Sequence, residues 1–264
     1  MNAIDLSQFE VADEANSSDL IRYLQAASSL PGVRRCKQVA LAELRLRPGH
    51  SVLDVGCGYG ADVLAMARRV GSAGRATGVD LSENMIREAR QRATGLPVTF
   101  ETADARRLRF AGATFDACRA ERLLQHVPDP AAAVAEMARV TRPGGRVVAI
   151  EFDLGGVILD SPDRGTTRRV LAEVADSTVN GWAGRQLPRL FKDAGLSRVR
   201  IRAELVLPSQ AFLEQIYTAA LGRIIAADDC LAGRLDAWSS QLRADASTGR
   251  FFAAAPAFIV SATR

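Results

Sequence analysis

The chain has 264 residues, of which 48% are hydrophobic, 24% charged and 6% aromatic, and this ordinary globular composition excludes a largely disordered or collagen-like chain. The length suits one large α/β domain with additions, or two small domains, and it can bury a substantial core. The formal net charge is +4, from 34 basic and 30 acidic residues. All basic residues except Lys37 and Lys192 are arginines scattered along the chain, so a nucleic-acid partner is not expected.

The sequence contains no candidate for a membrane-spanning segment. Its longest apolar stretch, Phe251–Ala262, contains Pro256 and falls short of the roughly 20 residues that cross a bilayer. The N-terminus lacks the basic region and apolar run of a secretion signal, so we expect a cytoplasmic protein. The cysteines are far apart and form no CxxC pair, which predicts reduced thiols in or near the core and no metal site: Cys36, Cys57, Cys118 and Cys230.

The first half of the chain alternates helical patterns with short apolar runs. Two helices, Asp19–Ser29 and Arg34–Leu44, are predicted on either side of a break at Pro31-Gly32. Further helices are predicted over Ala61–Val70, Glu83–Ala93 and Ala131–Val140. Strands are predicted over Ser51–Val55, Arg75–Asp80, Val98–Thr102, Phe115–Arg119 and Arg146–Phe152. Short apolar strands between amphipathic helices indicate a doubly wound, parallel α/β sheet covered on both faces.

The pattern loosens after residue 153. Helices are predicted over Thr167–Val179 and Gln186–Ala194, followed by a strand over Arg198–Leu207. A long helical stretch, Gln210–Ala246, and a last strand, Ala257–Thr263, complete the chain. About 40 helical residues between two strands suggest an insertion over one edge of the sheet. We therefore divide the chain into an N-terminal helical cover (1–47), a sheet core (48–208 and 256–264) and a helical lid (209–255).

The most informative segment is a glycine turn, VLDVGCGYGAD, at residues 52–62. Strand, glycine-rich turn and helix in this order bring backbone N–H groups and a helix N-terminus close to a bound ligand. Gly56, Gly58 and Gly60 leave room for that ligand and permit positive φ angles. The turn reads G-x-G-x-G, not the dinucleotide pattern G-x-G-x-x-G, and Asp54 precedes it. An acceptor at Asp54 suits an ammonium group better than a pyrophosphate.

Two acidic residues follow later strands. Asp80 ends the second strand, where a carboxylate accepts hydrogen bonds from two ribose hydroxyls. Asp104 lies just past the third strand, where it can accept from an amino group such as adenine N6. Either residue could instead only cap the helix that follows it. Together with the turn, these acids predict an adenosine-type cofactor.

At this point the sequence resembles the class I S-adenosylmethionine-dependent methyltransferases. Residues 52–60 match the first motif of that superfamily, 77–86 (TGVDLSENMI) the second and 101–105 (ETADA) the third. Residues 115–153 are similar to the region from strand four to strand five in its small-molecule branch, which includes ubiquinone/menaquinone-type and natural-product enzymes. The resemblance implies a Rossmann-like, doubly wound, seven-stranded sheet, mostly parallel, with an antiparallel last strand. It also implies S-adenosyl-L-methionine as cofactor and S-adenosyl-L-homocysteine as product.

The resemblance also implies a set of cofactor contacts. Those of the first motif are Asp54, Gly56, Cys57, Gly58 and Gly60. Asp80 is implied at the ribose, Leu81 and Met85 at the adenosine, and Asp104 and Ala105 at the adenine. Glu121 is implied at the methionine part of the cofactor. The family often has Ser or Asn near that position, and a charged Glu121 is also placed to pair with Arg119 or Arg122.

Candidate residues for catalysis and acceptor binding lie beyond the fourth strand. Methyl transfer from a sulfonium is an in-line displacement, so the protein must align the nucleophile, exclude water and, for an O–H or N–H nucleophile, supply a base. His126 lies on the carboxyl side of the sheet and is our candidate base, although it could instead only fasten its loop. Asp153 and Glu151, at the end of the fifth strand, are alternative acidic groups at the mouth of the site, and Asp153 is a predicted acceptor contact. Aromatic acceptor contacts are predicted from Tyr23, Trp182 and Tyr217, where ordinary packing is the alternative.

Rival functions fit the sequence less well. A short-chain oxidoreductase needs a Y-x-x-x-K pair, and neither lysine has a tyrosine four residues before it. A nucleic-acid methyltransferase of the exocyclic-amino type needs a Pro-Pro motif and a cytosine-C5 enzyme needs a Pro-Cys pair; both are missing. A cyclase that keeps the cofactor fold remains open, because one fold hosts several activities. The sequence thus predicts methyl transfer to a small molecule, such as a secondary metabolite or a quinone-like aromatic compound, and leaves the oligomeric state undetermined.

Overall fold

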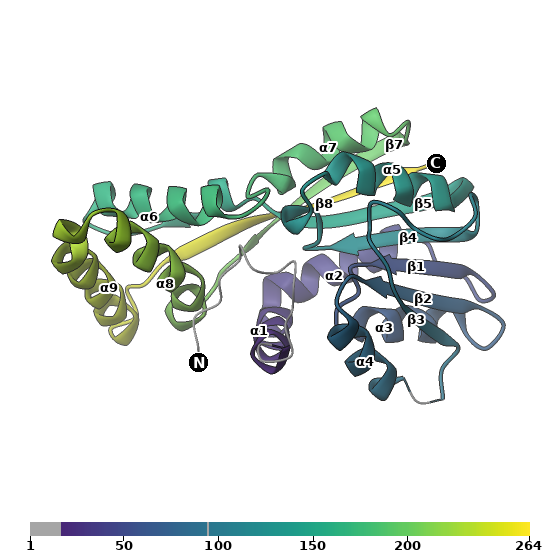
Figure 1. Cartoon of the computed structure of the whole chain (residues 1–264), viewed down its shortest axis with the longest axis horizontal. Coiled ribbons are helices and arrows are strands. Elements are labelled where there is room, and N and C mark those ends of the chain that lie inside the picture. Colours follow the sequence, from purple (N-terminus) through teal and green to yellow (C-terminus); the bar gives the residue numbers. More distant parts are fainter. Residues whose placement is uncertain (1–16, 94) are drawn as a thin grey trace.

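The chain forms one sheet with helices on both faces and a helical lobe at one side (Figure 1). The computed structural model describes residues 17–93 and 95–264, so residues 1–16 of the predicted cover lie outside the described residues. The strands are β1 (Ser51–Val55), β2 (Arg75–Asp80), β3 (Val98–Thr102), β4 (Phe115–Glu121), β5 (Thr141–Phe152), β6 (Ile158–Leu159), β7 (Ser197–Val206) and β8 (Ala253–Thr263). The helices are α1 (Ser17–Ser29), α2 (Pro31–Glu43), α3 (Ala61–Val70), α4 (Glu83–Arg92), α5 (Pro130–Val140), α6 (Arg164–Ser177), α7 (Ala183–Asp193), α8 (Gln210–Ala227) and α9 (Ala232–Ser247). None of the helices within the described ranges is long and apolar enough to cross a membrane.

The sheet has the predicted doubly wound, mostly parallel topology. Its strands follow the order β3-β2-β1-β4-β5-β8, and β7 pairs with β8. The pairs among β1 to β5 are parallel, whereas β8 runs antiparallel to both β5 and β7, as expected for the last strand. The sheet has eight strands because β6, a two-residue strand, pairs with Ala253 and Ala254 at the start of β8. β8 is longer than predicted and reaches from the helical lobe into the sheet between β5 and β7 (Figure 1).

The two faces of the sheet carry different helices. α2, α3 and α4 pack on one face, while α5 and α7 pack on the other. The first core includes Val33 of α2, Met66 of α3 and Ile86 of α4, all buried against the sheet. The second includes Met137 of α5 and Phe191 of α7. Burial of both faces explains why the strands read as continuous apolar runs.

A helical lobe of α6, α8 and α9 lies beside the sheet, at the left of Figure 1. α8 and α9 form the predicted helical insertion between the last two long strands, which is confirmed. α6 joins them, because its residues Val170 and Val174 share one apolar cluster with Tyr217 of α8 and Trp238 of α9. Trp238 Nε1 donates to Thr167 Oγ1 of α6 at 3.0 Å, and its ring meets that of Tyr217 edge to face at 5.0 Å. The lobe therefore has a core of its own.

Two local predictions need correction. The break expected at Pro31-Gly32 lies at Leu30, because Pro31 takes the first position of α2, where a missing N–H costs nothing. Gly32 lies inside this helix, and its lack of a side chain allows the close approach of β7, since a Cβ there would lie only 3.0 Å from Val206 Cα. Cys230 is exposed in the short connection between α8 and α9, not near the core, whereas the other three cysteines are buried.

The lobe core gives a first testable prediction. Trp238→Phe removes the hydrogen bond to Thr167 and leaves a small void, so we expect it to lower the free energy of unfolding by about 1–2 kcal/mol. Trp182, the only other tryptophan, is 50% exposed. Trp182→Phe should therefore lower the free energy of unfolding by less than about 1 kcal/mol. Urea titrations followed by circular dichroism measure both changes, and equal losses would contradict the buried position of Trp238.

Candidate active site

A cavity, hereafter the first cavity, opens at the carboxyl ends of the parallel strands beside the glycine turn. β1 lies between β2 and β4, so the chain order reverses there, and in open α/β sheets this reversal marks the ligand crevice. The lining comes from the turn, from the ends of β2 and β4, from the segment after β3 and from α1. The structure brings these predicted site residues to the first cavity: Tyr23, Asp54, Gly56, Cys57, Gly58, Asp80, Leu81, Met85, Asp104, Ala105, Glu121 and His126.

The glycines of the turn have two different roles. All three have positive φ, but a Cβ on Gly56 would lie 2.7 Å from Leu123, and one on Gly60 would lie 2.8 Å from Phe100. Gly60 is the N-cap of α3 and does not line the first cavity, so the structure gives it a packing role. A Cβ on Gly58 would have no neighbour nearer than Leu24, at 3.8 Å. Gly58 is therefore the position where the turn leaves its backbone open to a ligand.

Asp80 fixes the turn against the start of α4. One carboxylate oxygen accepts from the Gly58 N–H at 2.8 Å, and the other accepts from the Ser82 N–H at 3.0 Å. Ser82, not Asp80, caps the helix by accepting from the Met85 N–H. Burial raises the pKa of Asp80, against the lowering effect of these backbone donors. Each carboxylate oxygen keeps a lone pair that can accept a further hydrogen bond from a ligand.

The adenine-side residues differ in their surroundings. Leu81 is 54% exposed at the cavity, whereas Met85 and Ala105 are buried beside it. Asp104 accepts hydrogen bonds from the side chain of Arg106, which lowers the pKa of Asp104, and from the Arg106 backbone N–H. An exposed leucine at a cavity gains stabilisation when a flat apolar ligand covers it.

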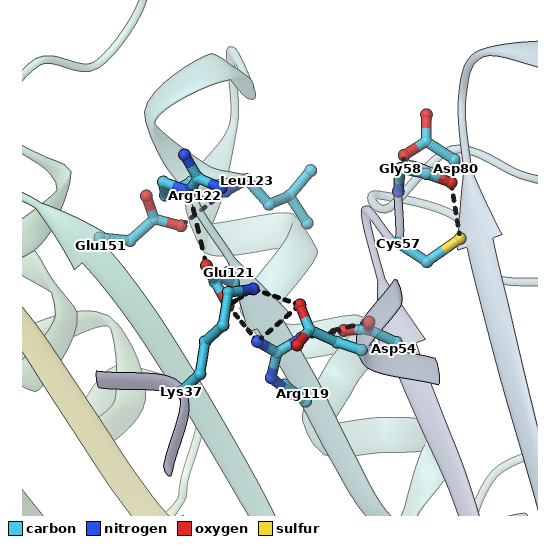
Figure 2. A network of polar contacts seen from close by, with 11 residues as sticks. Lys37, Asp54, Cys57, Gly58, Asp80, Arg119, Glu121, Arg122, Leu123 and Glu151 are labelled. Atoms are coloured by element: carbon cyan, nitrogen blue, oxygen red, sulfur yellow. Dashed lines mark hydrogen bonds and ion pairs between the residues drawn. The ribbon is translucent and has the colours of Figure 1, made fainter. Parts of the chain in front are cut away.

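A buried ionic network forms the floor of the first cavity (Figure 2). Arg119 is 3% exposed and lies opposite Asp54 in the register of β4 and β1. Its Nη1 donates to both carboxylate oxygens of Asp54, at 3.0 and 3.2 Å. Its Nη2 contacts Glu121, two residues further along the same strand, and Arg122 Nε lies 3.5 Å from Glu121 Oε1. The predicted pairing of Glu121 with Arg119 or Arg122 is therefore confirmed.

Lys37 and Asp62 extend this network to two helices. Lys37 Nζ of α2 lies 2.5 Å from Asp62 Oδ2 of α3 and 2.9 Å from Glu121 Oε2. Burial disfavours the charge of Asp62, but Arg119 and Lys37 lower the pKa of that carboxyl to about 2. Burial raises the pKa of Asp54 to about 6, with Arg119 opposing. The floor thus places acceptors and donors side by side, which suits the ammonium and carboxylate of an amino acid.

The segment after β4 is held from behind by Glu151 of β5. Glu151 is fully buried, and its Oε1 accepts from the backbone N–H groups of Leu123 and Leu124 at 2.9 and 2.7 Å. Burial raises the pKa of Glu151 to about 8. In the short 3-10 helix η2 (Leu124–His126), Gln125 Nε2 lies 2.8 Å from His126 Nε2. Glu151 therefore fixes the two polar side chains that face the first cavity from this segment.

A second cavity adjoins the first. Tyr23, Arg122 and Gln125 line both, and we call these three residues the junction. The rest of the second cavity is almost entirely apolar, with walls from α1, α6, α8, the end of β7 and the segment after β5. Tyr217 lines it, and Tyr23 stacks on Phe212 of α8 with 5.4 Å between ring centroids. The cavities together can take a polar ligand next to an apolar one.

Two predicted acceptor contacts lie elsewhere. Asp153 is buried, but Arg185 of α7 holds its carboxylate at 2.5 and 2.6 Å, and it lines neither cavity. Trp182 is half-exposed and packs against the Arg185 guanidinium, 4.4 Å from its ring centroid, also outside both cavities. These residues join α7 to the end of β5. Of the four predicted acceptor contacts, the structure thus brings Tyr23 and Tyr217 to the second cavity and leaves Asp153 and Trp182 outside both cavities.

Several residues that line the first cavity had no predicted site role: Lys37, Asp62, Arg119, Arg122 and Gln125. A signal existed for Arg119, because a charged residue inside an otherwise apolar strand must find a buried partner. Aligning the first and fourth strands side by side would have placed Asp54 opposite Arg119. The other residues depend on where α2, α3 and η2 lie in space.

Comparisons with known proteins agree with this geometry. Residues 52–145 match the model of a family described as a methyltransferase domain. An uncharacterized 37.1 kDa protein in transposon TN4556 of Streptomyces fradiae is 38% identical over 255 residues, covering 94% of this chain and 72% of the relative. A demethylmenaquinone methyltransferase of Staphylococcus aureus is 30% identical over 185 residues, covering 62% of this chain and 74% of the relative.

Solved structures share the fold at low identity. The phosphoethanolamine N-methyltransferase 2 of Haemonchus contortus, in complex with S-adenosyl-L-methionine, is similar with a TM-score of 0.64 and 18% identity, covering 99% of this chain and 60% of that one. The [4+2]-cyclase SpnF is similar with a TM-score of 0.57 and 20% identity, covering 100% of this chain and 98% of that one.

The sheet topology, the glycine turn and these matches define a class. The chain belongs to the class I S-adenosylmethionine-dependent methyltransferases, in the small-molecule branch that includes the ubiquinone/menaquinone-type enzymes. Its cofactor is S-adenosyl-L-methionine.

Glu151 predicts a pH dependence of stability. In the unfolded chain Glu151 has the ordinary pKa of 4.5, whereas in the folded chain its pKa is about 8. Between these pH values Glu151 is therefore ionised in the unfolded chain and protonated in the folded one. Between these values the folded state binds more protons, so its free energy of unfolding falls as pH rises, by at most about 1.4 kcal/mol per pH unit from this group. Glu151→Gln cannot titrate, so we expect its stability relative to the wild type to increase from about pH 5 to pH 8.

Chemical denaturation at a series of pH values measures this difference. Glu136→Gln is the matched control, because a hydrogen bond from Arg139 lowers the pKa of Glu136 and its contribution changes only in more acidic solution. Wild type and Glu151→Gln with parallel stability profiles between about pH 5 and pH 8 would contradict the raised pKa.

Proposed function

We propose that this protein transfers the methyl group of S-adenosyl-L-methionine to a small, largely apolar acceptor, such as a secondary metabolite or a quinone-like aromatic compound. The observation that carries the proposal is the contact between the two cavities: residues suited to an adenosine cofactor line the first, apolar side chains line the second, and the junction belongs to both. An acceptor in the second cavity would meet the cofactor only at that junction.

The residues of the first cavity fit the cofactor part by part. Asp80 would bind the ribose hydroxyls with its remaining lone pairs, and Leu81 and Met85 would cover the adenosine. Asp54, Arg119 and the neighbouring charges would hold the amino-acid part, while Gly58 leaves its backbone open beside it. The bound cofactor supplies an already activated methyl group, so this chain has to align the acceptor and exclude water.

His126 is the proposed general base for an O–H or N–H acceptor. It lines the first cavity and lies two residues after Leu124, whose backbone N–H donates to Glu151. In the contact with the Gln125 amide nitrogen, a neutral ring accepts at Nε2. Release of this contact would open the Nε2 lone pair to the proton of the acceptor.

Asp80 gives a test of cofactor binding. Asp80→Ala removes a charged acceptor for the ribose hydroxyls, and we expect a loss of about 1.5–3 kcal/mol, or roughly 10- to 150-fold, in affinity for S-adenosyl-L-methionine. Isothermal titration measures it, with NADPH as a second ligand that should not bind. Asp193→Ala, in an exposed carboxylate of α7, is the control. Unchanged affinity in Asp80→Ala, or tight binding of NADPH alone, would overturn the cofactor assignment.

His126 is tested by turnover. His126→Ala should lower kcat by about 100-fold or more, remove the ionisation that it contributes to the pH–rate profile and leave the affinity for S-adenosyl-L-methionine within about 3-fold. The measurement is S-adenosyl-L-homocysteine release with naphthol or a naphthoquinol as acceptor. His50→Ala changes the only other histidine and is the control. Unchanged turnover across the pH range would make His126 a structural residue.

A cyclase is the alternative function, since SpnF shares the fold across the whole chain. The same assay separates the two: a methyltransferase consumes cofactor in step with product, whereas a cyclase would bind the cofactor without forming S-adenosyl-L-homocysteine. A nucleic-acid methyltransferase or a nicotinamide-dependent oxidoreductase is not favoured by any feature of the two cavities.

A further inference from the structure

The junction contains two buried polar atoms that lack hydrogen-bond partners among the residues the structure describes: Arg122 Nε and Gln125 Oε1. Both residues line both cavities. Gln125 is only 6% exposed, and the Arg122 side chain is 13% exposed. A buried donor or acceptor left without a partner costs about 1–3 kcal/mol, so such atoms at a cavity wall point to a ligand group that completes them.

Arg122 is held at the junction by its backbone. It follows the last residue of β4 with φ +51°, a left-handed conformation that an arginine adopts only when its surroundings require it. Its N–H donates to Ile150 O at 2.8 Å, so the strained residue remains tied to β5. The 3.5 Å contact between Arg122 Nε and Glu121 Oε1 supplies charge but no hydrogen bond. The side chain is thus kept beside both cavities with one N–H available.

Gln125 offers the complementary atom. Its Nε2 contacts His126 at 2.8 Å, and its Oε1 is a buried acceptor without a partner among the described residues. A hydroxyl group could satisfy both an N–H donor and a C=O acceptor from residues that line the same two cavities, because it accepts with its oxygen and donates with its hydrogen. A carbonyl or an ether oxygen can satisfy only Arg122, and a purely apolar group satisfies neither.

We therefore infer that Arg122 and Gln125 form a hydroxyl-recognition site, and that the acceptor of the proposed reaction is an apolar molecule with a hydroxyl at the end that enters the junction. This inference rests on the proposed function and makes its substrate class specific. The apolar body lies in the second cavity, against residues such as Leu213, Ile216 and Tyr217 of α8.

The experiment measures binding rather than turnover. Naphthol, its methyl ether and naphthalene share one apolar body and differ in donor and acceptor atoms. Each is titrated into the complex of the full chain with S-adenosyl-L-homocysteine, with the intrinsic fluorescence or heat as readout. We expect naphthol to bind about 10-fold or more tightly than naphthalene, with the ether between them, because only the hydroxyl satisfies both atoms.

Two variants then test the residues. Arg122→Met should reduce the preference for the ether over naphthalene, and Gln125→Met should reduce the preference for naphthol over the ether, each to about 3-fold or less. Arg189→Met, at an exposed arginine of α7 that lines neither cavity, is the matched control and should leave the ratios unchanged. Cofactor affinity and melting temperature report whether each variant is folded. A wild type that binds the three ligands equally well, or binds none, overturns the inference.

These outcomes separate the inference from the proposed function. If the three ligands bind alike while S-adenosyl-L-homocysteine is released with another acceptor, the methyltransferase proposal stands and hydroxyl recognition is wrong. If naphthol is selected through Arg122 and Gln125 but no acceptor yields S-adenosyl-L-homocysteine, the recognition site stands and the chemistry is another one.

Discussion

The pairing of Arg119 with Asp54 is the interaction on which the site depends. These residues lie opposite each other on β4 and β1, at the point where the order of the strands reverses. A guanidinium buried in a sheet is stable only when its hydrogen bonds are made, and Asp54 and Glu121 make them on the same face. The pair therefore fixes the register of the central strands and the charged floor of the first cavity together.

The same network connects the sheet to its cover. Lys37 of α2 reaches Asp62 and Glu121, so the N-terminal helices are attached to the site by charge as well as by apolar packing. Burying these groups costs hydration, and replacing them with apolar residues of similar volume would often be neutral or stabilising. The proposed binding of the cofactor gives this network a purpose, because the amino-acid part of the cofactor brings both an ammonium and a carboxylate.

The fold and many of the residues that line the first cavity could be predicted from the sequence, because they follow from local patterns. Alternating apolar runs and helical periodicity define the sheet, and the glycine turn and Asp80 occur at fixed distances along the chain. The second cavity depends on contacts between distant segments. Asp153 follows β5 at the edge of the sheet where the carboxyl ends of the parallel strands lie. Its carboxylate nevertheless pairs with Arg185, which is 32 residues later in the chain. α6 has an ordinary amphipathic pattern that does not show whether a sheet or another helix covers it.

The excess of arginine over lysine has a structural explanation. Arg119, Arg146 and Arg185 each pair with a buried or half-buried acid that joins two elements. A planar guanidinium with several donors suits such contacts better than a lysine does. Against this background Arg122 is an exception, because its backbone has a positive φ and its buried Nε has no hydrogen bond among the described residues. Gln125 Oε1 also lacks a partner there, and both residues line both cavities. The proposed hydroxyl site gives these two atoms a role, because an unpaired buried donor or acceptor costs free energy unless a ligand completes it.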